Sequence, residues 1–247
     1  MSKGLSKAEV RHKEYVFQTS KTKDFYFISD THFNHKNIMR FCDRPYTSLE
    51  DMEKQMIERW NSVVKKDELV FILGDIIFGG SECYERILPQ LNGRKWLILG
   101  NHDYINIKQG FKKYFEKILN KAFITIDGVP IILNHEPLLC FAGQDKNKRW
   151  QLFGHVHTTK YLKKSCDFSR LELLCTPTMY DVGADFNNYK PIGFKELKQI
   201  INAQVEHKMN FIEYHKFISS NSVKKMVVQL KIKLKRYIIN KFILKIA

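Results

Sequence analysis

The sequence has few cysteines and no long apolar run. Its five cysteines are scattered among 247 residues, and no two of them form a Cys-x-x-Cys pair. This scatter argues against a disulfide framework or a thiolate zinc site, so we expect free cysteines in a reducing cytoplasm. No apolar run approaches the roughly 20 residues that a membrane-spanning helix needs. The polar, basic N-terminus predicts that there is no signal peptide.

Acidic residues are scarce at both ends of the chain. The formal net charge is +15; residues 1–23 carry six Lys or Arg against two acids, and residues 201–247 carry ten against two. The part between them is nearly balanced. Basic ends favour a polyanionic partner, either nucleic acid or an anionic membrane surface. A contribution to solubility alone explains the excess equally well.

The sequence also lacks internal repeats and low-complexity segments. We divide it into a basic N-terminal arm of residues 1–23, one domain of residues 24–202 and a basic C-terminal extension of residues 203–247. The arm has weak periodicity, which predicts a mobile segment with a short helix as an alternative. The domain is long enough to bury a substantial core.

Strand and helix patterns alternate in the first part of the domain. Apolar runs predict strands at 24–29, 69–73, 95–99, 150–153 and 171–174, and a hairpin at 122–133 with a type I′ turn at Asp127-Gly128. Helical spacing predicts helices at 48–64, 82–91, 111–119 and 191–201. Thr47 and Glu50 have the spacing of a capping box for the first of these helices. This order predicts an α/β (α+β) sandwich built on sheets.

The C-terminal extension has two competing patterns. Residues 228–235 alternate apolar residues and lysine, as a strand does, whereas apolar residues between 223 and 237 also share one helix face. Such short runs cannot be assigned by period. A helix docked on the core and a contact between copies are further interpretations.

Five apolar strands run directly into residues that can bind metal ions: Asp30, His32, Asp75, Asn101, His102, His135, His155 and His157. Carboxylate, carboxamide and imidazole groups suit divalent ions such as Mn²⁺, Fe²⁺ or Zn²⁺. Two pairs at i and i+2, Asp30/His32 and His155/His157, are expected to point to one side of an extended chain. Seven or more ligands are too many for one ion and suit two ions that share a carboxylate, for which Asp75 is the candidate.

In chain order, these residues form a series of motifs: Asp30-x-His32, Gly74-Asp75, Gly100-Asn101-His102-Asp103, Asn134-His135 and Gly154-His155-Val156-His157. The series resembles that of the calcineurin-like metallophosphoesterases and spans residues 25–157. The small bacterial and phage members are the most similar, including the later segment 181–191.

The resemblance implies a four-layer αββα sandwich of two mixed β-sheets with a dinuclear metal centre. One ion would be held by Asp30, His32 and His157, the other by Asn101, His135 and His155, with Asp75 as the bridge. Mn²⁺ is the preferred ion, with Fe²⁺, Zn²⁺ or Ni²⁺ as alternatives.

The resemblance also implies roles in proton transfer. His102 would protonate the leaving oxygen, which suits an imidazole near neutral pH, and Asp103 would orient its ring. Protein phosphatases of this superfamily have an Asp-Arg pair soon after the Gly-Asp motif, whereas this chain continues with Ile76-Ile77-Phe78. That departure favours a phosphodiesterase.

Polar residues in the loop after the first ligands are candidates for binding substrate. Asn34, His35, Arg40 and Arg44 lie in this loop and could reach the site. A structural role for Asn34 and Arg44 is an equal alternative.

These observations predict a dinuclear-metal-dependent phosphoesterase. The expected reaction is attack of a metal-bound hydroxide on a phosphate ester with His102 as the acid, and the basic ends suggest a nucleotide or nucleic acid substrate. One alternative is a membrane-surface hydrolase of a lipid-linked pyrophosphate, because residues 222–247 are both basic and apolar. Another is a non-catalytic binding scaffold, against which the intact ligand positions argue.

Overall fold

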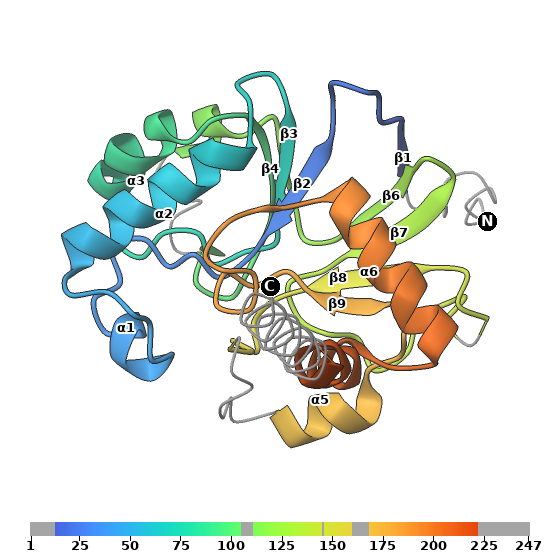
Figure 1. Cartoon of the computed structure of the whole chain (residues 1–247). Helices are drawn as coiled ribbons and strands as arrows, with labels where there is room; N and C mark the ends of the chain where they lie inside the picture. The colour runs from blue at the N-terminus through green and yellow to red at the C-terminus, as the bar shows by residue number, and fades with distance from the viewer. Residues whose placement is uncertain (1–12, 105–110, 145, 160–167, 222–247) are drawn as a thin grey trace, which may run out of the picture.

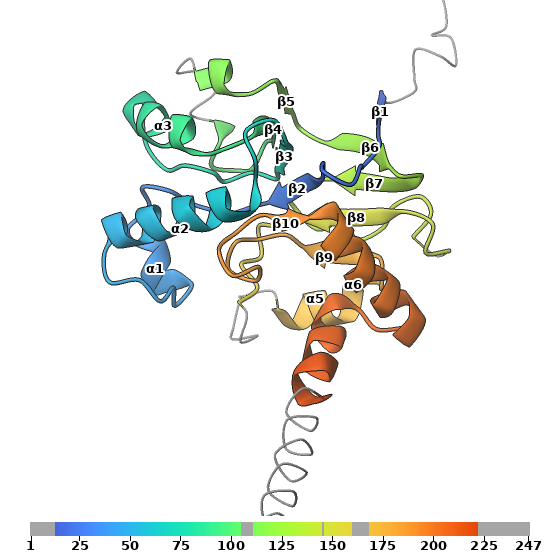
Figure 2. The same cartoon turned by 45° about the horizontal axis from the view of Figure 1, so that its top comes forward.

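The structure is a computed structural model that describes residues 13–104, 111–144, 146–159 and 168–221. Two five-stranded sheets face each other at its centre (Figures 1 and 2). The first sheet has the order β10-β2-β3-β4-β5 and the second β1-β6-β7-β8-β9. Each sheet combines parallel pairs with one antiparallel pair, β10/β2 in the first and β6/β7 in the second.

The strands of the first sheet are β2 (Phe25–Ile28), β3 (Leu69–Ile72), β4 (Arg94–Ile98), β5 (Lys117–Leu119) and β10 (Ile192–Gly193). Those of the second are β1 (Glu14–Phe17), β6 (Ala122–Ile126), β7 (Val129–Leu133), β8 (Trp150–Phe153) and β9 (Met179–Asp181). The helices are α1 (Ile38–Phe41), α2 (Leu49–Val63), α3 (Ser81–Ile87), α5 (Phe168–Leu174) and α6 (Phe194–His207), with the 3₁₀ turns η1 (Leu88–Gln90) and η2 (Phe111–Tyr114).

Helices cover the outer sides of the two sheets. The helices α2 and α3 lie beside the first sheet, and α5 and α6 lie on the side of the second sheet (Figure 2). Along β2 and β3, Phe27 and Phe71 join the core between the sheets, whereas Ile28 and Ile72 join the core beneath α2. This alternation explains why apolar runs without a polar face form these strands. The predicted four-layer αββα sandwich of two mixed sheets is confirmed.

Helix α2 begins one residue later than the capping pattern predicted. Its N-cap is Ser48, whose Oγ accepts a hydrogen bond from the N–H of Asp51 at 3.1 Å. The carboxylate of Asp51 in turn accepts from the N–H of Thr47 at 3.0 Å. The N-cap is therefore Ser48 rather than Thr47, and the carboxylate of Asp51 caps the N–H of the residue before this N-cap.

The hairpin prediction at 122–133 is confirmed. Strands β6 and β7 pair antiparallel, with Ile126 opposite Val129. Asp127 and Gly128 have φ values of 48° and 76°, as the two central positions of a type I′ turn require.

Two predicted elements are wrong because tertiary pairing outweighs the local pattern. Residues 111–119 form the turn η2 and then β5, whose residues pair with Trp96–Ile98 of β4. Residues 171–174 belong to α5 rather than to a strand, since β9 occupies the place beside β8. In α5, Leu171 is buried but Leu173 is 85% exposed.

The ends of the described chain are more ordered than the sequence predicted. Residues 14–17 form β1, parallel to β6, and the ring of Phe17 packs against Phe71 and Trp96. At the other end, the helix predicted at 191–201 begins after β10 and runs to His207. Residues 211–221 are helical, and Phe211 joins the core.

The described start of the C-terminal extension thus packs against the domain through Phe211 and Ile212, whereas Ile218 further along is 39% exposed. The strand and helix patterns of 223–237 lie outside the described residues, as do residues 1–12, and the predicted boundaries after 23 and 202 remain predictions. In the described part of the chain, no helix is both long and apolar enough to cross a membrane.

Candidate metal centre

The carboxyl ends of five strands from both sheets meet at one edge of the sandwich. Asp30 and His32 follow β2, Asp75 follows β3, Asn101 follows β4, His135 follows β7, and His155 and His157 follow β8. The two sheets are joined there, since Ser29 forms an isolated bridge with Gly183 and its N–H donates to the carbonyl of Val182 at 3.0 Å. Ligands from separate strands are therefore brought to a single place.

Left-handed backbone turns aim most of these side chains. Five of the seven predicted ligands have positive φ, namely Asp30, His32, Asp75, His155 and His157, with values from 48° to 71°. The extended geometry predicted for the i and i+2 pairs is therefore wrong, because the chain turns at these residues. Left-handed non-glycine residues are strained, and such strain gathers at functional sites. The glycine before Asp75, Gly74, is also left-handed, and a Cβ on it would lie 2.5 Å from Nδ1 of His135.

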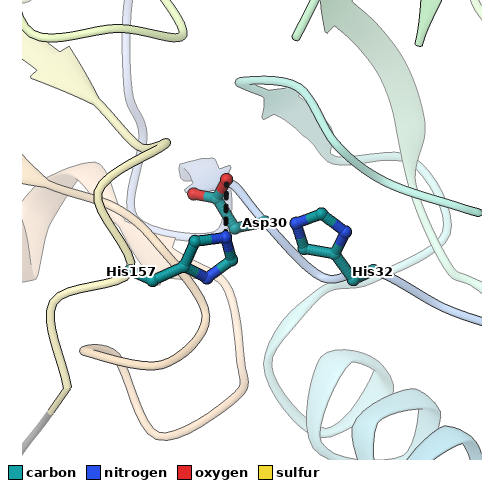
Figure 3. A group of neighbouring side chains, drawn as sticks. All are labelled: Asp30, His32 and His157. Carbon is teal, nitrogen blue, oxygen red and sulfur yellow. Dashed lines mark ion pairs between the residues drawn. The ribbon is translucent and has the colours of Figure 1, made fainter. Parts of the chain in front are cut away.

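Asp30, His32 and His157 form the first group of ligands. Their ligand atoms lie within 4.8 Å of one another, and Nε2 of His157 is 4.0 Å from Oδ1 of Asp30. Figure 3 shows the carboxylate of Asp30 next to the imidazole ring of His157, with the ring of His32 nearby. Oδ1 of Asp30 and Nε2 of His32 are buried and have no hydrogen-bond partner among the described residues. Since an unpaired buried polar atom is costly, this group fits a bound cation.

Asn101, His135 and His155 form the second group. Oδ1 of Asn101 lies 3.1 Å from Nε2 of His135 and 3.1 Å from Nδ1 of His155, and the two ring nitrogens are 3.2 Å apart. Three lone-pair atoms converging in this way suit one divalent ion.

Asp75 lies between the two groups. Its Oδ2 is 3.7 Å from Nε2 of His32 and 3.5 Å from Nε2 of His135. Burial raises the pKa of Asp75, and the neighbouring charge of Asp30 adds to this effect. A buried carboxylate that touches both groups has the position expected of a bridging ligand.

Hydrogen bonds fix which nitrogen of two histidines faces the centre. Nδ1 of His135 donates to the carbonyl of Leu73 at 2.6 Å, and Nδ1 of His157 lies 2.9 Å from Oδ2 of Asp185. Each contact leaves Nε2 as the ligand atom.

The same surroundings favour protonated imidazoles. Burial lowers the pKa of His157, but its contacts with Asp185, Cys42 and Asp30 raise it more, to about 11. Burial likewise lowers the pKa of His135, and the carboxylates of Asp30 and Asp75 raise it above its ordinary value. An entering metal ion must displace these protons.

Arg44 lies beneath the centre rather than in it, which favours a structural role over contact with substrate. Its side chain is fully buried. Nε and Nη2 bond the carboxylate of Asp185 at 2.7 and 3.0 Å, Nη1 donates to the carbonyl of Thr31 at 2.8 Å, and Nη2 to that of Asp30 at 2.7 Å. Arg44 thus supports Asp30 directly and His157 through Asp185.

Sequence reasoning gave no role to Asp185. The available signal was its place in the 181–191 segment, which resembles the later segment of the family. Burial raises the pKa of Asp185, but the positive charges of Arg44 and His157 lower it by more, so this pKa lies below its ordinary value. Asp185 is therefore a charged group that orients His157.

The other candidates for substrate binding differ in position. Nδ2 of Asn34 donates to the carbonyl of Phe78 at 2.8 Å, and its N–H donates to Glu53 at 2.9 Å, which favours a structural role. The ring of His35 lies 5.4 Å from that of His32, between centroids, and therefore borders the centre. Arg40 is exposed on α1.

His102 lies at the exposed side of the centre. Its side chain is 44% exposed, and its Nε2 is 4.0 Å from Oδ2 of Asp75. The neighbouring Asp103 is fully buried and accepts hydrogen bonds from the N–H groups of Gly100 and Asp75, both at 2.8 Å. These contacts indicate that Asp103 holds the loops after β3 and β4 together, a different role from the predicted orientation of the His102 ring.

Two hollows open beside the second group. One, of about 360 Å³, is lined by His155 and by apolar side chains that include Leu138, Leu171 and Met179. The other, of about 290 Å³, is lined by Asn101 and His135 together with polar residues such as Lys121. A substrate held at the metal centre would have room for substituents on this side.

Comparison with known proteins gives consistent matches. Residues 23–174 match the family model described as calcineurin-like phosphoesterase. The chain is 31% identical to the uncharacterized protein MJ1445 of Methanocaldococcus jannaschii over 185 residues, which are 72% of this chain and 92% of that protein. It is 28% identical to the Gene 66 protein of Mycobacterium phage L5 over 166 residues, covering 56% of this chain and 80% of the phage protein.

A solved structure also resembles this one. The protein of unknown function AQ665 from Aquifex aeolicus superposes with a TM-score of 0.57 at 26% identity, covering 72% of this chain and all of that chain.

Proposed function

The chain belongs to the calcineurin-like phosphoesterase family, and from this premise we propose that it is a phosphodiesterase that depends on two divalent metal ions. The observation that carries the proposal is that two groups of ligands meet at the carboxylate of Asp75. The first group also contains buried polar atoms without a hydrogen-bond partner among the described residues. Mn²⁺ is the proposed ion, in keeping with the oxygen and imidazole ligands.

The ligands fall into two sets. Asp30, His32 and His157 would hold one ion, and Asn101, His135 and His155 the other, with Asp75 shared. Bound there, the ions would supply Lewis-acid stabilisation of charge on the phosphate and an activated water nucleophile.

The protein's own groups would complete the reaction. Nε2 of His102 faces the centre from its exposed side and would give its proton to the leaving oxygen. The carboxylate of Asp103 would hold Asp75 in place by accepting a hydrogen bond from the backbone N–H of Asp75. Arg44 and Asp185 would keep the ring of His157 turned towards the first ion.

Two features support a diester over a monoester. A monoester carries more negative charge. Of the two arginines that the sequence offered for binding substrate, Arg44 is fully engaged by Asp185 and two carbonyls, and Arg40 lies on α1 over the ring of Phe41. The residues after Asp75 are Ile76 and Ile77, which are buried and offer no cation. The basic ends of the chain support a nucleotide or nucleic acid as the diester.

The test is hydrolysis of bis-p-nitrophenyl phosphate and p-nitrophenyl phosphate after chelation and re-addition of Mn²⁺. We expect Mn²⁺-dependent cleavage that is faster for the diester, lost in Asp75→Ala and slowed in His102→Ala. Leu173→Ala, an exposed change on α5, serves as the matched control and should retain activity. Absence of turnover of both esters with Mn²⁺, Fe²⁺, Zn²⁺ and Ni²⁺ would contradict the proposal.

A further inference from the structure

Three aromatic rings form an exposed surface beside His102. Phe78 stacks on His35 with ring centroids 4.4 Å apart and an interplanar angle of 19°, and Phe41 lies 6.2 Å from His35. Phe41 is 61% exposed and Phe78 is 43% exposed. We name Phe41, His35 and Phe78 the aromatic platform. Large exposed apolar side chains gathered in one place often mark a binding site.

The platform is next to the metal centre on the side of the proposed acid. The ring of Phe78 lies 5.9 Å from that of His102, and the ring of His35 lies 5.4 Å from that of the ligand His32. A group that leaves from a phosphate at this centre, with its oxygen protonated by His102, would emerge beside the ring of Phe78.

The platform is also held in place. The N–H of Phe78 donates to the carbonyl of Phe33 at 2.8 Å, and the carbonyl of Phe78 accepts from Nδ2 of Asn34 at 2.8 Å. Phe33 and Ile77 form a bridge that ties the two loops together. A surface fixed before binding loses little entropy when a flat ligand stacks on it.

Positive charge lies at the edge of the platform. The guanidinium of Arg40 is 5.2 Å from the ring centroid of Phe41, and Lys36, which follows His35 in the chain, is exposed. Aromatic rings beside basic groups are the combination that binds nucleobases and their phosphates without regard to sequence.

We infer that the aromatic platform stacks the base of the leaving nucleoside, so that the substrate is a phosphodiester with a nucleoside on its leaving oxygen. This inference rests on the proposed function. In the reaction, water supplies the entering oxygen, the P–O bond to the nucleoside breaks, and the nucleoside oxygen takes the proton of His102. The proton that the water loses passes to solvent, from which His102 is protonated again. Phe78, whose ring lies 5.9 Å from that of His102, would contribute most of the preference for a nucleoside leaving group.

The test compares two esters of one nucleotide. Thymidylyl-thymidine presents a base on its leaving group. The methyl ester of thymidine monophosphate presents none when methanol leaves, so its cleavage is measured as the thymidine monophosphate formed and not as thymidine. We expect Phe78→Leu, which keeps an apolar side chain but removes the flat ring, to lower kcat/KM for the dinucleotide about tenfold. The methyl ester should change less than twofold. The control Leu173→Ala should leave both esters unchanged, and circular dichroism checks that Phe78→Leu is folded.

A binding measurement separates this inference from the proposed function. Fluorescence anisotropy reports the Kd of a labelled single strand of ten thymidylates with metal ions removed, and Phe78→Leu should weaken it about tenfold. If Phe78→Leu lowers kcat/KM for the dinucleotide but leaves the Kd of the strand unchanged, the result also supports the platform and assigns it to small nucleotides.

Equal effects of Phe78→Leu on both esters, or no effect on ester cleavage and binding, would overturn the platform. If the wild-type protein cleaves neither ester, the proposed function fails. The anisotropy comparison then decides the platform alone, and an unchanged Kd in Phe78→Leu overturns it.

Discussion

Replacing Arg44 with methionine removes the cation beneath the metal centre and leaves a buried carboxylate behind. The side chain of Asp185 is 1% exposed, so its charge cannot be solvated by water once the guanidinium is gone. The carbonyls of Thr31 and Asp30 lose their hydrogen bonds at the same time. Removing one partner of a buried ion pair costs about 3–5 kcal/mol, and we expect this loss in the free energy of unfolding of Arg44→Met.

Urea unfolding followed by tryptophan fluorescence measures this loss. It is carried out in chelator, so that weaker metal binding does not add to the difference. The matched control is Arg59→Met, because Arg59 is exposed and its side chain donates only a long hydrogen bond, at 3.3 Å, to the carbonyl of Asn188. The control should stay within about 0.5 kcal/mol of the wild type.

A second variant identifies the buried charge as the cause. Adding Asp185→Asn to Arg44→Met removes a buried carboxylate whose remaining ion-pair partner is His157, so the double variant should be about 1–3 kcal/mol more stable than the sum of the two single changes. If Arg44→Met unfolds like the wild type and instead raises KM, Arg44 binds substrate and the structural assignment is refuted.

Three further outcomes follow from the site. His102→Gln should slow the hydrolysis of diesters with alkyl leaving groups about 10²- to 10⁴-fold. It should slow p-nitrophenyl diesters much less, because p-nitrophenolate leaves without a proton. Equal slowing of both kinds of diester would argue against His102 as the acid. Asp185→Asn should weaken Mn²⁺ binding about 10- to 100-fold by loosening the ring of His157, and calorimetric titration would show an unchanged Kd if Asp185 has no such role. Because the pKa of His157 is about 11 in the metal-free protein, Mn²⁺ binding at pH 7 should release protons and tighten as pH rises towards that value; a binding enthalpy that does not vary with the buffer would contradict this.

The positions of the ligands could be predicted because each follows an apolar strand directly. Strands such as β3 are buried on both faces, so their apolar runs stand out, and the polar residue that ends each run marks the sheet edge. How the side chains are aimed could not be predicted in this way. It depends on left-handed turns at residues such as Asp30 and His157, which sequence patterns of aspartate and histidine do not require.

The ion pair beneath the metal centre could not be predicted for a different reason. Arg44 and Asp185 are 141 residues apart, and no local pattern relates them. The strand predicted at 171–174 failed similarly, because only the folded sheet shows that β9 already pairs with β8. Local propensity assigns single elements, whereas pairing over long distances decides which of two plausible elements forms.

The central claim is that one chain holds two divalent ions joined by Asp75. The most direct measurement is the metal content and calorimetric stoichiometry of chelated protein after re-addition of Mn²⁺, with Asp75→Asn beside the wild type. We expect two ions per wild-type chain and at most one tightly bound ion in Asp75→Asn. A wild-type stoichiometry of one or none, or an unchanged stoichiometry and affinity in Asp75→Asn, would contradict a dinuclear centre built on this carboxylate.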